Sequence, residues 1–292
     1  AKKEAAKDGG VRTLVPYVML GLELINWLIR QSVPALLLFM KTDTTTFPDG
    51  ISQVEEAGIN GAYFLGYMAL LVPAGVLQKM VGAHRSLTYS LIAIAFALLV
   101  IPMLASAGPM ELPLIGAVSS PVLISSMLTL VGALSSPFLP ARLTMLSKWM
   151  PKSENAEALT IIKNGNLIGK IFGAQVSTMI AMSLGWKFVF YGLGCFTFVY
   201  ALVWTFLLTD KPSQHATISA DELAFINANC ASPDDDNTKK EDDKGKGSKK
   251  DAAVQWPTMP VHLLFAMTAW MPIICHVVHN YGSYTLSQSG IK

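Results

Sequence analysis

Hydrophobic residues along this chain gather into long segments that are separated by shorter polar connections. Seven segments approach or exceed the roughly 20 residues that a helix needs to cross a bilayer. They cover residues 14–40, 57–81, 87–107, 114–146, 158–184, 188–208 and 259–286. Backbone polar groups must be satisfied inside lipid, and the chain lacks the ten-residue alternating segments of a membrane β-barrel. The pattern therefore predicts an all-α integral membrane protein with seven transmembrane helices.

Composition narrows the classes of function. Hydrophobic residues make up 52% of the chain and charged residues 14%, whereas a soluble chain carries about 25% charged residues. This excludes a nucleic-acid-binding domain, a disulfide-stapled secreted domain and a disordered chain. The three cysteines form no CxxC pair, so they indicate no disulfide framework and no zinc site. The sequence also carries no G-x-S-x-G motif and no P-loop, so we expect no enzymatic activity, no cofactor and no metal.

Lysine and arginine concentrate on alternate connections. They occupy the N-terminal tail and the connections after the second, fourth and sixth segments, and the connection after the fourth holds Arg142, Lys148 and Lys152. Alternate connections share one side, which the positive-inside rule identifies as cytoplasmic or its organellar (stromal) equivalent. We therefore expect the N-terminus and the central loop on that side. Ala1 in place of Met fits either a trimmed chain or a removed targeting peptide, and the second would suit an organelle such as a plastid.

The same pattern predicts four parts. Residues 1–13 form a polar tail, 14–208 a six-span bundle, 209–257 a polar linker, and 258–292 a seventh span that begins a C-terminal half absent from the chain. Within the linker, Ser219 and Glu222 have the spacing of a capping box that opens a short surface helix through Asn229. Residues 234–250 are charged and lack aromatic and aliphatic side chains, which predicts disorder.

Several blocks, in order, carry a resemblance to a known family. They are Tyr63 to Tyr67 with Pro73-Ala74-Gly75, Pro140-Ala141 with Ser147 to Pro151, Gly165 with Gly169, Gly185-Trp186, Asp210-Lys211-Pro212, and Asn280-Tyr281-Gly282. The chain thereby resembles the anion:cation symporters of the major facilitator superfamily, and most closely solute carrier family 17, which includes sodium–phosphate, vesicular glutamate, sialic acid and plastid phosphate transporters. The resemblance implies the six-helix N-terminal half of a major facilitator fold plus a seventh transmembrane helix.

The superfamily's gating motif after the second span is similar to residues 75–84. Gly75, Leu77 and Gly82 match it, but Lys79 replaces the carboxylate that helps to hold the two halves together in the family. A cation cannot accept the hydrogen bonds that a carboxylate accepts. The sequence therefore predicts that this contact is altered.

Other departures fall at positions that the family uses for anion binding and proton coupling. Leu128 and Ser135 stand where the family has an Arg and a Glu in the fourth span. Asn60 stands where vesicular glutamate transporters carry a His. We take Asn60 and Tyr67, both in the second span, as candidate substrate-binding residues.

Arg30 and Glu23 are charged residues within the first predicted span. Burying an Arg in lipid costs about 2.5–3.5 kcal/mol on the mildest scale, so such a residue usually faces the bundle interior. Arg30 matches the family's Arg in this span, which favours an anion clamp over a purely structural ion pair. Glu23 shares its helix face but lies about 10 Å away along the helix. Glu23 is either a coupling site, the partner of a Lys from another helix, or exposed.

Lys163 and Lys170 lie on one face of the fifth predicted span. The same span carries Gly165 and Gly169, the small-xxx-small pattern of close helix packing. Lys163 can reach the interface by snorkelling. Lys170 is deeper, and either supplies the positive charge missing at Leu128 or pairs with Glu23 or another acid. His276 and His279 lie on one face of the seventh span, where lining a cavity is a better interpretation than binding a metal.

Two hypotheses of different classes follow. The first is a secondary active transporter of inorganic phosphate or a small organic anion, whose partners are that anion, sodium or protons, and the lipid bilayer. The second is a transporter-derived structural subunit of a larger membrane complex that no longer transports. The second is motivated by the departures at Lys79, Leu128 and Ser135 and by the end of the chain after its seventh span.

Overall fold

The computed structural model describes residues 10–112 and 116–230. These residues belong to one compact unit of the chain, Ala1–Lys244. The predicted seventh span, the charged run over 234–250 and the residues His276 and His279 lie outside the described residues.

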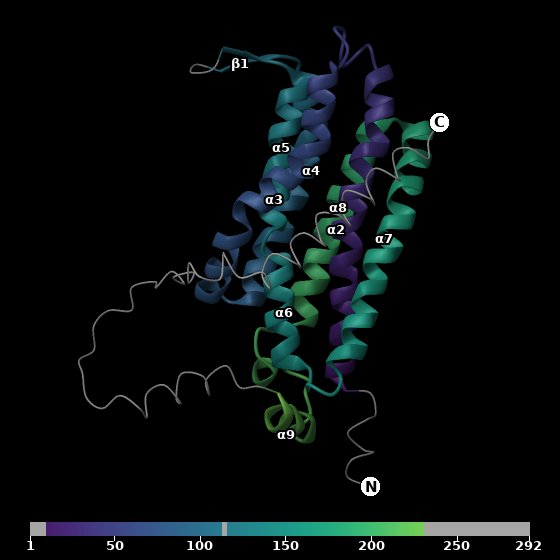
Figure 1. Ribbon diagram of the computed structural model, residues 1–292. Coiled ribbons are helices and arrows are strands. Elements are labelled where there is room, and N and C mark those ends of the chain that lie inside the picture. The colour runs from purple at the N-terminus through teal and green to yellow at the C-terminus, as the bar shows by residue number, and fades with distance from the viewer. Residues whose placement is uncertain (1–9, 113–115, 231–292) are drawn as a thin grey trace, which may run out of the picture. The chain divides into compact units, whose positions relative to one another are not determined.

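Long helices make up most of this unit (Figure 1). They are α2 (Val11–Thr42), α3 (Gln53–Val81), α4 (Ala83–Ala107), α5 (Ser120–Ser135) with α6 (Phe138–Trp149), α7 (Asn155–Leu184) and α8 (Trp186–Leu207). Counting α5 and α6 together, six helices among the described residues are long and apolar enough to cross a membrane. The prediction of a helical integral membrane fold is confirmed.

The fourth predicted segment, 114–146, is wrong at its start. Strand β1 (Met110–Leu112) pairs antiparallel with β2 (Gly116–Val118), and the helix begins only at Ser120. Hydropathy alone cannot distinguish a short apolar strand from the beginning of a buried helix. Pro121 lies in the first turn of α5, where its missing N–H is not needed.

The same segment is also divided into two helices. Helix α5 ends at Ser135 and α6 begins at Phe138, with Ser136 and Pro137 between them. Proline has no backbone N–H to donate and its ring disfavours a helical conformation in the residue before it. Ser136 and Pro137 nevertheless keep α-helical backbone angles, so α5 and α6 together form one membrane-length stretch whose second part carries Arg142.

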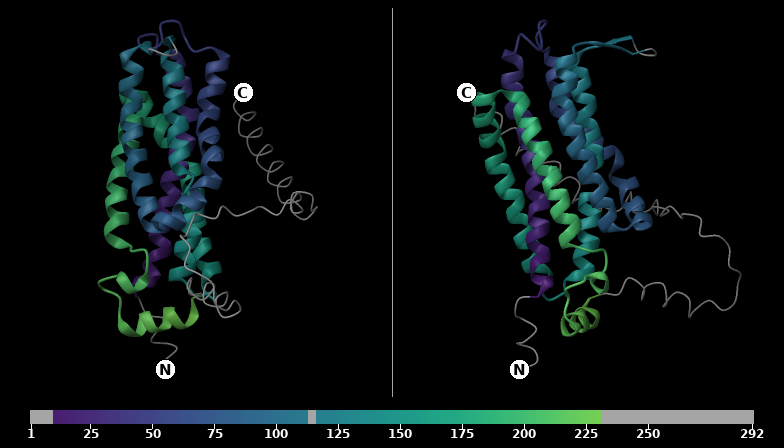
Figure 2. Two further views of the ribbon diagram at one scale, coloured as in Figure 1. Left: turned by 90° about the vertical axis from the view of Figure 1, so that its left-hand side faces the viewer. Right: turned by 180° about the vertical axis from the view of Figure 1, so that it is seen from behind.

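Glycines allow the helices to pack closely in pairs. Helix α7 packs along α2, and α5 packs along α3, as the two views of Figure 2 also show. A Cβ atom added at Gly165 would collide with the carbonyl of Leu20, and one at Gly169 would lie 2.7 Å from Cβ of Trp27. Gly132 of α5 lies equally close to the backbone of Tyr63. Small residues therefore set the helix spacing, as in other membrane bundles.

The basic connections gather at one end of this bundle. Helix α9 (Ala220–Asn229) lies at the same end as the beginning of α2 (Figure 1). Contacts of Asp210 join the α3–α4 turn to the end of α6 there. At the other end, the Trp186 indole donates a hydrogen bond of 2.9 Å to Asp43. The beginning of α2 and residues 209–230, the described part of the linker, therefore lie at one end of the bundle.

Candidate functional site

A polar stripe runs along one face of α2. Glu23, Asn26, Trp27 and Arg30 follow the i, i+3, i+4, i+7 spacing that aligns side chains on a helix. The stripe faces neighbouring helices, because Asn26 accepts a hydrogen bond of 2.7 Å from the hydroxyl of Tyr63 on α3. The candidate site is built around this stripe.

Aromatic rings surround Arg30. Its guanidinium carbon lies 4.2 Å from the ring centre of Trp27, 4.5 Å from that of Phe64 and 5.3 Å from that of Tyr63. The face of an aromatic ring attracts a cation through its quadrupole but carries no net charge. These contacts therefore position the guanidinium without cancelling its charge.

Lys170 of α7 contacts the same tryptophan. Its Nζ lies 4.0 Å from the ring centre of Trp27, so Trp27 holds two cations that come from different helices. The alternative in which Lys170 pairs with Glu23 is wrong, because Glu23 contacts Arg142. No described carboxylate forms an ion pair with Lys170. Lys163, seven residues earlier, is exposed, and so is Lys170, which the sequence had placed deeper.

Glu23 forms an ion pair with Arg142 of α6. The two side chains are only 12% and 14% exposed. Sequence reasoning placed Arg142 in a basic connection, and the structure corrects this: α6 directs Arg142 into the bundle. The available signal was its position within the predicted fourth segment, seven residues before the Trp149 that ends α6.

Asn60 and Tyr67 lie on α3 close to this cluster. The rings of Tyr67 and Tyr63 stack with centroids 6.4 Å apart, and Tyr67 lies within the electrostatic reach of Arg30. The side-chain oxygen of Asn60 is buried and has no hydrogen-bond donor among the described residues. Tyr67 can therefore offer a polar group near Arg30, and Asn60 lies one turn of α3 from the Tyr63 ring that contacts Arg30.

Leu128 and Ser135, which stand where the family has an Arg and a Glu, are both uncharged. Leu128 is fully buried in the hydrophobic core. Ser135 is buried as well, and its hydroxyl donates to the carbonyl of Val131 at 2.8 Å.

The motif of Gly75, Leu77, Lys79 and Gly82 lies at the end of α3. Lys79 is exposed and Leu77 is half-exposed. Gly82 has a φ of 97°, a conformation that favours glycine and permits the abrupt turn into α4.

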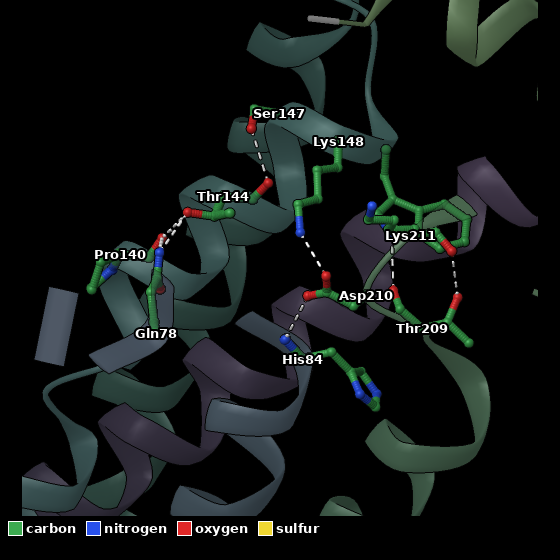
Figure 3. A network of polar contacts seen from close by, with 10 residues as sticks. Gln78, His84, Pro140, Thr144, Ser147, Lys148, Thr209, Asp210 and Lys211 are labelled. Carbon is green, nitrogen blue, oxygen red and sulfur yellow. Dashed lines mark hydrogen bonds and ion pairs between the residues drawn. The ribbon is translucent and has the colours of Figure 1, made fainter. Parts of the chain in front are cut away.

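The carboxylate of Asp210 accepts a hydrogen bond from the turn between α3 and α4. Asp210, which follows α8, accepts hydrogen bonds from the backbone N–H of His84 at 3.2 Å and from Nζ of Lys148 at 2.7 Å (Figure 3). Burial by itself would raise the pKa of Asp210, but the bonds from Lys148 and His84 outweigh it and hold the pKa below its ordinary value. Sequence reasoning did not foresee this contact.

Helix α9 contacts the beginning of α2. Glu222 accepts hydrogen bonds from the backbone N–H groups of Val11 and Arg12 at 3.3 and 2.7 Å. The Arg12 guanidinium lies 3.3 Å from Glu154. The capping box predicted for α9 is therefore only half formed: Ser219 accepts from the N–H of Glu222, while the Glu222 carboxylate caps α2 instead.

Six membrane-length helices among the described residues define the class, a multi-pass helical membrane protein. The family model described as Major Facilitator Superfamily matches residues 19–291. The chain belongs to this superfamily.

Similar proteins include named anion transporters. The chain is 26% identical over 228 residues to sodium-dependent phosphate transport protein 1, chloroplastic, of Arabidopsis thaliana, covering 78% of this chain and 38% of that protein. It is 25% identical over 231 residues to human sialin, covering 79% and 41%. It is 24% identical over 212 residues to vesicular glutamate transporter 1 of Xenopus laevis, covering 69% and 35%. The chain thus spans about two fifths of the length of these relatives.

Proposed function

We propose that this chain is part of a secondary active transporter that moves inorganic phosphate or a small organic anion by alternating access. One observation carries the proposal: Arg30 and Lys170, from two helices, lie within 4.2 Å of the ring centre of Trp27. The names of the relatives, which include a phosphate transport protein and a glutamate transporter, support the same class of substrate.

The chemistry of the cluster suits an anion. Two positive charges near one ring repel each other, and a bound anion would offset that repulsion. The planar guanidinium of Arg30 can hold a carboxylate or phosphate by two parallel hydrogen bonds, whereas Lys170 would add a point charge. Asn60 and Tyr67 would supply polar hydrogen-bonding groups beside them.

Transport against a gradient requires a coupled ion, and we propose sodium or a proton. One relative is named as sodium-dependent. Glu23 is the coupling candidate, because it is a nearly buried carboxylate on the same face of α2 as Arg30. We also propose that the bundle end carrying α9 and the basic connections faces the cytoplasm or stroma, following the positive-inside rule.

A structural subunit of a larger membrane complex is the second candidate. The uncharged residues Leu128 and Ser135 favour it, because the resemblance implies ionisable side chains there. The two candidates differ in whether the full-length protein moves any anion.

Uptake of labelled phosphate and glutamate by proteoliposomes tests the proposal. The full-length protein is compared with its Arg30→Lys and Arg30→Ala variants, and Lys163→Ala serves as a control cation outside the cluster. Both Arg30 variants should lose most uptake, because a charge-assisted hydrogen bond contributes about 1.5–3 kcal/mol, a factor of ten or more. Wild-type uptake by Arg30→Ala would contradict the clamp. No uptake by the intact protein with any anion and either coupling ion would favour the structural subunit.

A further inference from the structure

We propose that Arg142 is a second anion-binding position on the transport path, and that Glu23 occupies it as an internal anion when substrate is elsewhere. The inference rests on the proposed function and extends it from one cationic position to two. It starts from the ion pair that joins Glu23 of α2 to Arg142 of α6.

The location of the pair places it on the path. Glu23 lies seven residues before Arg30 on one helix face, about 10 Å along α2. Helix α2 begins at the basic end of the bundle, where Arg12 pairs with Glu154. Glu23 is therefore nearer to that end than Arg30 is. An anion that leaves the Arg30 cluster toward the basic end along this face of α2 passes Arg142 on its way.

Joining two helices by this ion pair carries a large desolvation cost. With only 12% and 14% of their surfaces exposed, both side chains lose most of their hydration, and in such settings a pair of well-packed apolar side chains often stabilises as well or better. Close packing of the neighbouring helices α2 and α7 relies on glycines, with Gly165 against the backbone of Leu20 and Gly169 against that of Leu24. A buried charge pair at this place therefore points to a use beyond packing.

Arg142 also has unused hydrogen-bonding capacity. A guanidinium carries five donors, and the Nε of Arg142 is buried without an acceptor among the described residues. Glu23 therefore satisfies the side chain only in part. A phosphate or carboxylate that displaced Glu23 would find a desolvated, planar donor group of the kind that binds such anions by two bonds.

Competition between Glu23 and the substrate would keep this position from holding the anion too tightly. When the anion arrives, the Glu23 carboxylate must leave Arg142, and when the carboxylate returns, it displaces the anion. An internal competitor of this kind lowers affinity and favours release.

Equilibrium binding of labelled phosphate to the purified full-length protein tests the inference. Glu23→Gln removes the competitor while keeping the size of the side chain, so phosphate affinity should rise about tenfold, the effect of one charge-assisted hydrogen bond, while uptake into proteoliposomes slows. Glu23→Asp keeps the charge but shortens its reach, so it should raise affinity by a smaller factor. This second variant serves if Glu23→Gln fails to fold.

Two further variants identify the cause. Adding Arg142→Gln to Glu23→Gln should return the affinity to the wild-type value, because the second position is then lost. Glu56→Gln breaks the more exposed ion pair of Glu56 with Lys41 and should leave affinity unchanged. Unchanged or weaker affinity in folded Glu23→Gln and Glu23→Asp proteins would overturn the inference while leaving the Arg30 site intact. No phosphate or glutamate binding by the wild type would overturn both the inference and the proposed function.

Discussion

Cations midway along the membrane-length helices and cations at the basic end of the bundle are held in different ways. Midway along the helices, Arg30 and Lys170 lie against the ring of Trp27. At the end, Lys148 pairs with Asp210 at 2.7 Å, and Arg12 pairs with Glu154 at 3.3 Å. A ring fixes the position of a cation and leaves its charge available, whereas a carboxylate neutralises the charge.

The two kinds of contact suit two roles, anion binding and stabilisation of the fold. A cation held by an aromatic ring can still attract an anion, because the ring carries no net charge. The ion pairs at the basic end instead hold the connecting segments to the ends of the helices. The pair of Glu23 and Arg142 is the exception, because it joins a cation to a carboxylate within the membrane-length helices.

The largest effect is expected from a substitution that forces α2, which carries Trp27, away from α7, which carries Lys170. Gly165→Ala puts a methyl group into the carbonyl of Leu20, and overpacking of this kind typically costs about 1–3 kcal/mol. We expect a lower melting temperature and loss of anion uptake together. Gly192→Ala, with nothing within 4 Å of the added Cβ, is the control. A Gly165→Ala protein with normal melting and normal uptake would show that close packing of α2 and α7 does not support the site.

The next effect concerns the basic end alone. Asp210→Asn keeps a possible acceptor for the His84 N–H but loses the ion pair with Lys148, so we expect a loss of about 1–3 kcal/mol of stability at pH 7 with anion affinity retained. The pKa of Asp210 is lowered from an ordinary value of 3.8. Its stabilisation is therefore complete above that value and is lost as the pH falls through the lowered pKa.

Melting temperatures measured across pH check this sign. The difference between wild type and Asp210→Asn should be constant near neutral pH and should shrink as the pH drops below 3.8. Glu56→Gln, which removes the ion pair with Lys41, is the control and should have a small effect, because exposed pairs contribute about 0–1 kcal/mol. A loss of anion affinity in folded Asp210→Asn protein would contradict the claim that the basic end stabilises the fold without taking part in anion binding.

The smallest effect is expected at a cation–ring contact outside the interior. Lys187 lies 5.6 Å from the ring centre of Trp186 at the opposite end of the bundle. Lys187→Ala should cost less than about 1 kcal/mol and should leave uptake unchanged, whereas Lys170→Ala should greatly reduce uptake. Equal losses of uptake in the two variants would mean that ring contact by itself does not distinguish the substrate-binding lysine.

Hydropathy predicted most of the fold because membrane helices need long apolar segments. The second span was expected over 57–81 and is Gln53–Val81, and the sixth was expected over 188–208 and is Trp186–Leu207. The start of the fourth span was not predictable in this way, since the apolar residues near Met110 and Val118 form a hairpin. Strand pairing depends on contacts that a sliding average does not represent.

The site was only partly predictable. A charged residue within a span was sufficient reason to choose Arg30, Lys170 and Glu23 as candidates. Their partners were not predictable, because they depend on how neighbouring helices turn: Trp27 contacts both cations, and Arg142 pairs with Glu23. The spacing of Trp27 and Arg30, three residues apart on one helix, was the one local signal of the aromatic contact.

Anion-induced thermal stabilisation of two matched lysine variants tests the central claim most directly. A ligand that binds only the folded protein raises its melting temperature, so the shift caused by phosphate reports on the binding site, and the melting temperature without phosphate reports on the fold. We expect Lys170→Gln to melt like the wild type without phosphate but to lose the shift. We expect Lys148→Gln to melt at a lower temperature but to keep the shift. A full phosphate shift in Lys170→Gln, or its loss in Lys148→Gln, would contradict the assignment of anion binding to the cations held by Trp27.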